Sequence, residues 1–229
     1  MIFQMALKIK NWRTLTKWIL IGVFVVLFLV FFIRVVVFEH NYYGEKEGSE
    51  RAIAMDMGDD LVEVPPSDKE VAEYKVAADR PRYLSIERLG ITNARVLPMG
   101  ITQDGELSTP NNIFDVGWYY DSGKPGQGGT LLIDGHNGGP HVQGVFKALP
   151  SLGIGDIITI ERGDGQIFKY SVVENIAVPL SEANNYMATA IKSPMKGKES
   201  VTLISCTGEW SQAQKTYLSR QFTRAILVE

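Results

Sequence analysis

The chain has 229 residues, of which 45% are hydrophobic and 21% are charged, and its formal net charge is −3 at pH 7. These values are ordinary for a globular protein of one or two domains. Residues 39–80 carry a net charge of −7 and residues 81–229 a net charge of −1, so a basic nucleic-acid-binding face is not expected.

Residues 18–38 are apolar except for Arg34. As a helix they would extend about 31 Å, close to the thickness of a bilayer's hydrocarbon core. The following sequence lacks the small-residue cleavage site of a signal peptide, which favours an uncleaved membrane anchor. Residues 1–17 contain four basic and no acidic residues. The positive-inside rule therefore predicts a cytoplasmic tail, a transmembrane helix over 18–38 and an external location for residues 39–229.

Residues 39–80 are expected to form an acidic stalk between the membrane and the next domain. The stretch 39–66 ends in a proline pair and shows no regular apolar pattern, which is typical of a linker. Ser67 and Glu70 then fit a capping box that could open a short helix as far as about Ala78. Continuation of the flexible linker is an equally good interpretation of this last stretch.

Residues 81–229 show the pattern of an all-β domain with minor helices. Short apolar or alternating runs are separated by glycine, proline and asparagine, which favours an antiparallel sandwich or barrel over alternating strand–helix units. The predicted strands are 83–89, 94–99, 129–136, 156–161, 167–178, 200–205 and 222–228. A glycine-rich loop over 121–129 and a long connection over 179–199 lie between them, and the latter has the length of a binding loop.

Cys206 is the only cysteine, so a disulfide within the chain is excluded. In an external protein a single cysteine suggests a free reactive thiol. A thiol nucleophile needs a proton donor, and His136, at the end of a predicted strand, is a better candidate than His40 near the membrane or His141 in the following loop. A metal hydrolase that uses His136, His141 and Cys206 is the rival enzyme class, but the five-residue histidine spacing is a poor template for tetrahedral zinc.

The motifs of residues 81–229 resemble those of the sortases, membrane-anchored cysteine transpeptidases of bacterial surfaces. The family signature TLxTC is similar to TLISC at 202–206, with Ser205 in place of the second threonine. Upstream, a Pro-Gly turn and a strand ending in Gly-His correspond to 124–136, and F-x-x-L followed by Gly-Asp corresponds to 146–156. An arginine that opens the terminal apolar strand corresponds to 224–228.

This resemblance implies an eight-stranded β-barrel with Cys206 as nucleophile, His136 as proton donor and an arginine that stabilises the oxyanion. Arg224 is favoured for that role because alternating apolar residues follow it directly. Arg220, four residues earlier, faces the same side of an extended strand about 13 Å away and is the alternative.

The resemblance also implies the reaction. The enzyme would cleave an LPxTG-like sorting signal between Thr and Gly, form a thioacyl enzyme and pass the acyl group to an amine. The implied partners are surface proteins or pilins that carry the signal, and a cell-wall precursor or pilin lysine as acceptor. We expect no cofactor, and the sequence leaves calcium dependence open. The loop over 179–199 would contribute to specificity. A non-catalytic sortase-fold module at the cell surface is the alternative function, and the separation of His136 from Cys206 argues against an L,D-transpeptidase.

Overall fold

The computed structural model describes residues 61–102 and 105–229, together with isolated positions between 21 and 34. The chain divides into two units, Met1–Ala52 and Ile53–Glu229, and the second unit contains the whole of the β-domain. Most of the span predicted at 18–38, and residues 39–60 of the predicted stalk, lie outside the described residues. Within the described part of the chain, no helix combines the length and the apolar character that crossing a membrane requires.

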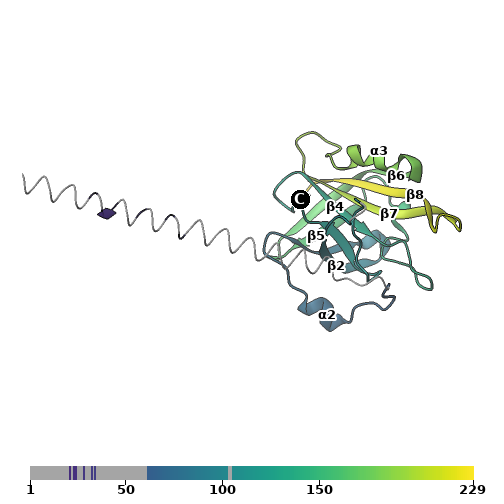
Figure 1. The fold of residues 1–229 in the computed structure, drawn as a ribbon, viewed down its shortest axis with the longest axis horizontal. Coiled ribbons are helices and arrows are strands. Elements are labelled where there is room, and N and C mark those ends of the chain that lie inside the picture. The colour runs from purple at the N-terminus through teal and green to yellow at the C-terminus, as the bar shows by residue number, and fades with distance from the viewer. Residues whose placement is uncertain are drawn as a thin grey trace, which may run out of the picture. The chain divides into compact units, whose positions relative to one another are not determined.

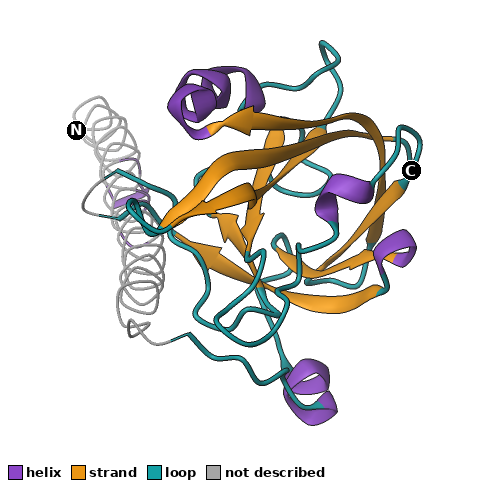
Figure 2. Ribbon diagram, turned by 90° about the vertical axis from the view of Figure 1, so that its right-hand side faces the viewer, coloured by secondary structure: helices purple, strands orange, loops and turns teal. Residues whose placement is uncertain are grey.

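Eight strands close into a barrel in the order β1-β2-β3-β4-β7-β8-β6-β5, which confirms the predicted eight-stranded all-β architecture (Figures 1 and 2). The pairs β2–β3 and β4–β7 are parallel and the others are antiparallel. The strands are β1 Pro81–Ile86, β2 Ile91–Met99, β3 Val116–Tyr119, β4 Thr130–Gly135, β5 Ile157–Arg162, β6 Ile167–Pro179, β7 Ser200–Ser211 and β8 Thr216–Leu227. Among the described residues of the second unit, the helices are α2 Asp68–Glu73, α3 Leu180–Ala190 and the 3₁₀ turns η1 Glu87–Leu89 and η2 Leu149–Ser151.

The barrel interior is filled by alternate side chains of the strands, as expected for a sheet with one face in a core. In β4 the inward residues are Leu131 and Ile133, and in β7 they are Val201 and Leu203; all four are fully buried in one apolar cluster. The residues between them therefore point out of the barrel.

A second apolar cluster covers part of that outer surface. Ile204 of β7 and Phe222 of β8 pack against Ala183 and Ala190 of α3. The ring of Tyr186, also from α3, lies 4.8 Å from the ring of Phe222 between centroids. The long connection at 179–199 is therefore a helix laid on the barrel followed by a loop, where the sequence suggested only a loop.

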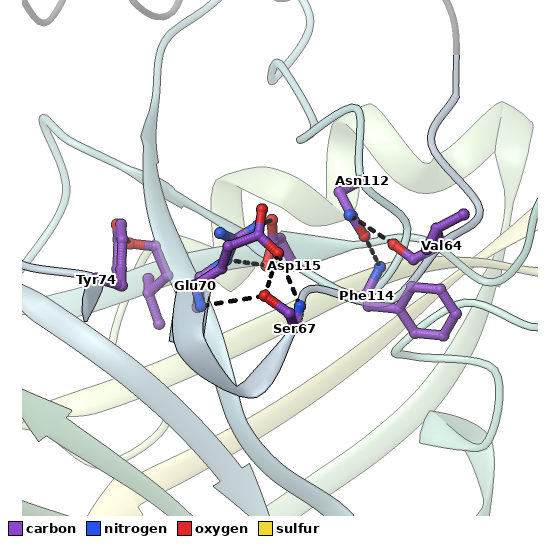
Figure 3. Close-up of polar contacts among 9 residues, drawn as sticks. Val64, Ser67, Glu70, Tyr74, Asn112, Phe114 and Asp115 are labelled. Carbon is purple, nitrogen blue, oxygen red and sulfur yellow. Dashed lines mark hydrogen bonds and ion pairs between the residues drawn. The ribbon is translucent and has the colours of Figure 1, made fainter. Parts of the chain in front are cut away.

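The chain reaches the barrel through residues 61–66, which we call the N-terminal strap. Val62 forms a parallel bridge with Asn112, whose side-chain amide donates to the carbonyl oxygen of Val64 at 2.9 Å (Figure 3). The carboxylate of Glu63 accepts the backbone N–H groups of His141 at 2.9 Å and Val142 at 3.3 Å. The strap is thus attached to two loops of the barrel.

The predicted capping box is confirmed at the start of α2. The backbone N–H of Ser67 donates to Glu70 Oε2 at 2.8 Å, and the backbone N–H of Glu70 donates to Ser67 Oγ at 3.3 Å (Figure 3). The helix ends at Glu73, earlier than the predicted Ala78, and Tyr74 in extended conformation follows it. The hydroxyl of Tyr74 donates to the carbonyl of Val96, which pins this segment to β2.

Candidate active site

Cys206 lies on the outward face of β7, two residues beyond Ile204 and past the part of the strand that α3 covers. It is a free thiol and is partly buried. Burial raises the pKa of the Cys206 thiol, while the positive charge of Arg220 lowers it and the carboxylates of Asp134 and Glu106 raise it further. The thiol therefore sits among one cationic and two anionic groups.

His136 follows directly on the end of β4, which runs parallel to β7. The last paired residues are Asp134 and Ile204, and the hydroxyl of Ser205 donates to the carbonyl of Gly135 at 2.8 Å. Continuing this register by two residues, past the end of β4, would bring His136 toward Cys206. The hydrogen bond from Ser205 needs only a hydroxyl donor, which serine provides as well as the threonine of the sortase motif would.

The ring of His136 is oriented by a backbone carbonyl. Its Nε2 lies 2.7 Å from the carbonyl oxygen of Pro110. A carbonyl can only accept, so Nε2 carries a proton and donates it, and Nδ1 is the nitrogen that remains for proton exchange. Burial lowers the pKa of His136, and the bond to Pro110 raises it to a smaller extent.

Arg220 is the arginine that the strand register places at the site. In the antiparallel pair β7–β8 it lies directly opposite Cys206. Its guanidinium donates to the carbonyl oxygens of Tyr217 at 3.0 Å and Ser219 at 3.2 Å, both within its own hairpin. It forms no described bond to another element of the barrel, so its charge can act on the thiol.

Arg224 occupies a different environment, four residues along β8 and opposite Thr202. Its buried guanidinium forms an ion pair with Glu174 of β6 and donates to the carbonyl oxygens of Thr189 at 3.2 Å and Lys192 at 2.8 Å. These contacts cap the C-terminal end of α3 and hold it on the sheet. We therefore favour Arg220 over the sequence-based choice of Arg224.

Asp134 was missed from the sequence although the signal was present. It stands two residues before His136 in β4, and side chains two apart in a strand share a face. Burial raises its pKa to about 7. This partly buried carboxyl lies near the Cys206 thiol, and the alternation of side chains along the strand places it on the same face as His136.

His141, the alternative histidine, does not join the site. The backbone of His141 contacts Glu63 in the loop after β4, and its side chain is exposed. His40 lies outside the described residues. Across the residues that the structure describes, no three side chains of His, Cys, Asp or Glu gather as metal ligands. A cavity of about 600 Å³ at the C-terminal end of α3 is lined by Glu174, Lys192 and Arg224, among others, on the side of the helix end rather than at the thiol.

Comparison with known proteins agrees with this architecture. The family model described as the Sortase domain matches residues 84–228. Among curated proteins, none is detectably similar in sequence to the chain.

The chain is also similar to several solved structures. Sortase C of Streptococcus pneumoniae aligns with a TM-score of 0.50 at 17% identity, over 79% of this chain and 85% of that one. A sortase D5 transpeptidase of Clostridium perfringens aligns at 21% identity, over 72% and 90% of the two chains, with a TM-score of 0.46. Sortase C-1 of Actinomyces oris aligns at 16% identity, over 82% and 99%, with a TM-score of 0.49. With the family model matching well over half of its residues, the chain belongs to the sortase family.

Proposed function

We propose that the chain is a cysteine transpeptidase in which Cys206 is the nucleophile, His136 the proton donor and acceptor, and Arg220 the oxyanion-stabilising cation. The observation that carries the proposal is the strand register. It supports a site in which Cys206 on β7 and Arg220 on β8 share an outward face, and His136 directly follows the neighbouring strand β4.

The first half-reaction is acylation. The thiolate of Cys206 attacks the carbonyl carbon of a peptide bond, and the charge that moves onto the carbonyl oxygen is stabilised by the guanidinium of Arg220. As the C–N bond breaks, imidazolium His136 gives the proton on Nδ1 to the departing amine. The products are a thioester on Cys206, a neutral imidazole and the released C-terminal fragment.

The second half-reaction reverses these roles. An incoming amine attacks the thioester carbonyl, and neutral His136 takes its proton while the C–S bond breaks. A new amide, the Cys206 thiolate and imidazolium His136 result, so the starting state is restored and no oxidant or cofactor is required. Arg220 suits both steps because a guanidinium stays charged over the whole physiological range and donates in fixed directions.

The proposed substrates are proteins with an LPxTG-like sorting signal, cleaved between Thr and Gly, and the proposed acceptors are amines of a cell-wall precursor or a pilin subunit. The similar solved structures include the Streptococcus pneumoniae sortase C, which is described as having pilin substrate specificity. α3 and the loop to residue 199 border the outer face that carries Cys206, which supports a role in recognising the signal. We further propose that residues 18–38 anchor the protein in the cell membrane with the barrel outside.

The decisive experiment is capture of the acyl enzyme. The full-length protein in mild detergent would be incubated with a library of Leu-Pro-x-Thr-Gly peptides and analysed by mass spectrometry. We expect an adduct on Cys206 with the mass of the fragment ending in Thr, its loss on adding an acceptor amine, and no adduct with Cys206→Ala. A folded protein whose alkylatable Cys206 never forms an adduct with any peptide contradicts the proposal and favours a non-catalytic surface module.

A further inference from the structure

The outward face of β4 carries a second ionisable group that the proposed mechanism does not use. Asp134 precedes His136 by two residues and is paired in parallel register with Ile204 of β7. Cys206 is two residues beyond Ile204, so Asp134 and Cys206 are diagonal neighbours on adjacent strands. Such neighbours are about 8 Å apart.

The surroundings of Asp134 leave room for its carboxyl group but provide few interactions that stabilise the negative charge. Its Oδ2 accepts one side-chain hydrogen bond, from the hydroxyl of Thr109 at 2.5 Å. On the other side, β3 presents Gly117 in direct register, and a Cβ there would collide with Asp134 Oδ1. The glycine thus leaves the space that the carboxyl fills. Among the residues that the structure describes, no cation forms an ion pair with this carboxyl.

A carboxyl with these surroundings changes its protonation near neutral pH. Burial raises the pKa of Asp134 to about 7, and the bond from Thr109 only partly offsets this. The other charged or titratable groups around the thiol are Arg220 on β8, the exposed Glu106, and His136 just beyond the end of the strand that carries Asp134. Asp134 is therefore an anionic group near the thiol whose charge changes close to neutrality.

We propose that Asp134 is a positioning residue that acts on Cys206 electrostatically: the ionised carboxylate restrains formation of the thiolate, and protonation of the carboxyl releases that restraint. The inference rests on the proposed function only in taking Cys206 as the nucleophile. Below neutral pH, where Asp134 is protonated, the positive charge of Arg220 favours the Cys206 thiolate without opposition from the Asp134 carboxylate. Its reactivity rises less steeply above neutrality than that of an isolated thiol.

The test is the pH dependence of Cys206 alkylation, which needs no substrate. The full-length protein, Asp134→Asn and the control Glu209→Gln would be treated with iodoacetamide between about pH 5.5 and 9 and followed by mass spectrometry. Glu209 is an exposed carboxylate three residues from Cys206 on the same strand, so its removal controls for net charge.

We expect Asp134→Asn and wild type to react alike below about pH 6, where Asp134 is protonated. Above about pH 8 the variant should react about 2.5-fold to thirtyfold faster, the range that Coulomb's law gives for a unit charge about 8 Å away at effective dielectric constants between 80 and 20. Glu209→Gln should stay within about twofold of wild type throughout, because solvent screens exposed charges.

A rate ratio near one at every pH overturns the proposal. A ratio that differs from one but is the same at every pH also overturns it, because that is the signature of a purely structural change. Should Asp134→Asn fail to fold, Thr109→Val removes the single side-chain bond to the carboxylate. It must then move the bend in the alkylation profile to higher pH, and an unmoved bend counts against the proposal. A pH-dependent ratio without any peptide adduct would reject the transpeptidase function and retain this inference.

Discussion

The two arginines of β8, Arg220 and Arg224, are predicted to have different roles, one in catalysis and one in stability. Arg220→Gln should abolish most acyl transfer and leave the fold almost unchanged, whereas Arg224→Gln should weaken the fold and leave most of the chemistry. The two residues lie on the same strand and face, so each variant is the matched control for the other.

The magnitudes follow from the contacts. Arg220 donates mainly to carbonyl oxygens of its own hairpin, so its loss should change the free energy of unfolding by under about 1 kcal/mol. Removing an oxyanion donor typically lowers kcat by about 100-fold to 1000-fold. Removing one partner of a buried ion pair costs about 3–5 kcal/mol. The side chain of Glu174 is 31% exposed, so water can replace part of what Arg224 provides and about 2–3 kcal/mol is expected.

Both quantities can be measured on the same samples. Guanidinium unfolding gives the free energy of unfolding, and the rate of peptide-to-amine transfer gives kcat/KM at 25 °C. A loss of about 2–3 kcal/mol leaves a domain of ordinary stability folded at that temperature, so Arg224→Gln should keep kcat/KM within about tenfold of wild type. The reasoning fails if Arg224→Gln is inactive at wild-type stability while Arg220→Gln remains active.

Three further results are expected. Ser205→Ala should lose about 1 kcal/mol of stability in guanidinium unfolding and should lower kcat/KM, because the hydrogen bond from Ser205 to Gly135 joins β7 to β4. Ser205→Thr keeps the hydroxyl and should match wild type. Equal behaviour of the two variants would contradict this. The plateau of kcat/KM against pH should be wider than the interval between 6.5 and 9.0, because burial lowers the pKa of His136 and raises the pKa of Cys206. The reactive thiolate–imidazolium form appears above the first of these pKa values and disappears above the second. A plateau no wider than this interval would contradict the prediction. Glu199→Ala should lose about 3 kcal/mol, measured by guanidinium unfolding, since this buried carboxylate accepts two glycine N–H groups of the loop before β4 and one tyrosine hydroxyl; a loss under about 1 kcal/mol would show that the loop is held by other contacts.

The strands and two of the proposed site residues could be predicted from local signals. Apolar alternation located seven of the eight strands, and Cys206 and His136 stand at recognisable positions on β7 and beyond the end of β4. β3 was missed because Val116–Tyr119 is four residues long and contains a glycine, which is too short for a periodic pattern. The helix α3 was missed for another reason: only Ala183 and Ala190 are buried in it, so its apolar face is weak.

The choice between the arginines depends on register, which is a property of two strands together. Arg224 was favoured because apolar residues follow it in the predicted strand 222–228, but β8 begins at Thr216 and so includes Arg220 as well. Pairing runs from Ser211 opposite Thr216 and passes a bulge between Thr207 and Trp210 before Cys206 meets Arg220. Counting back from the hairpin turn would have placed the partner of Cys206 within a residue or two of Arg220. The remaining error comes from the bulge, which the pattern of one strand alone does not reveal.

The N-terminal strap limits how many residues can be removed from the N-terminus without losing contacts that hold the site. The family match begins at residue 84, yet Glu63 supplies the acceptor for two N–H groups in the loop that follows His136, and the backbone of Val62 pairs with the loop that follows Pro110. A recombinant fragment cut at the family boundary would expose those donors and free both loops that position the imidazole. The smallest unit that keeps this support begins no later than residue 62, so the folding domain is longer than the stretch by which the family is identified.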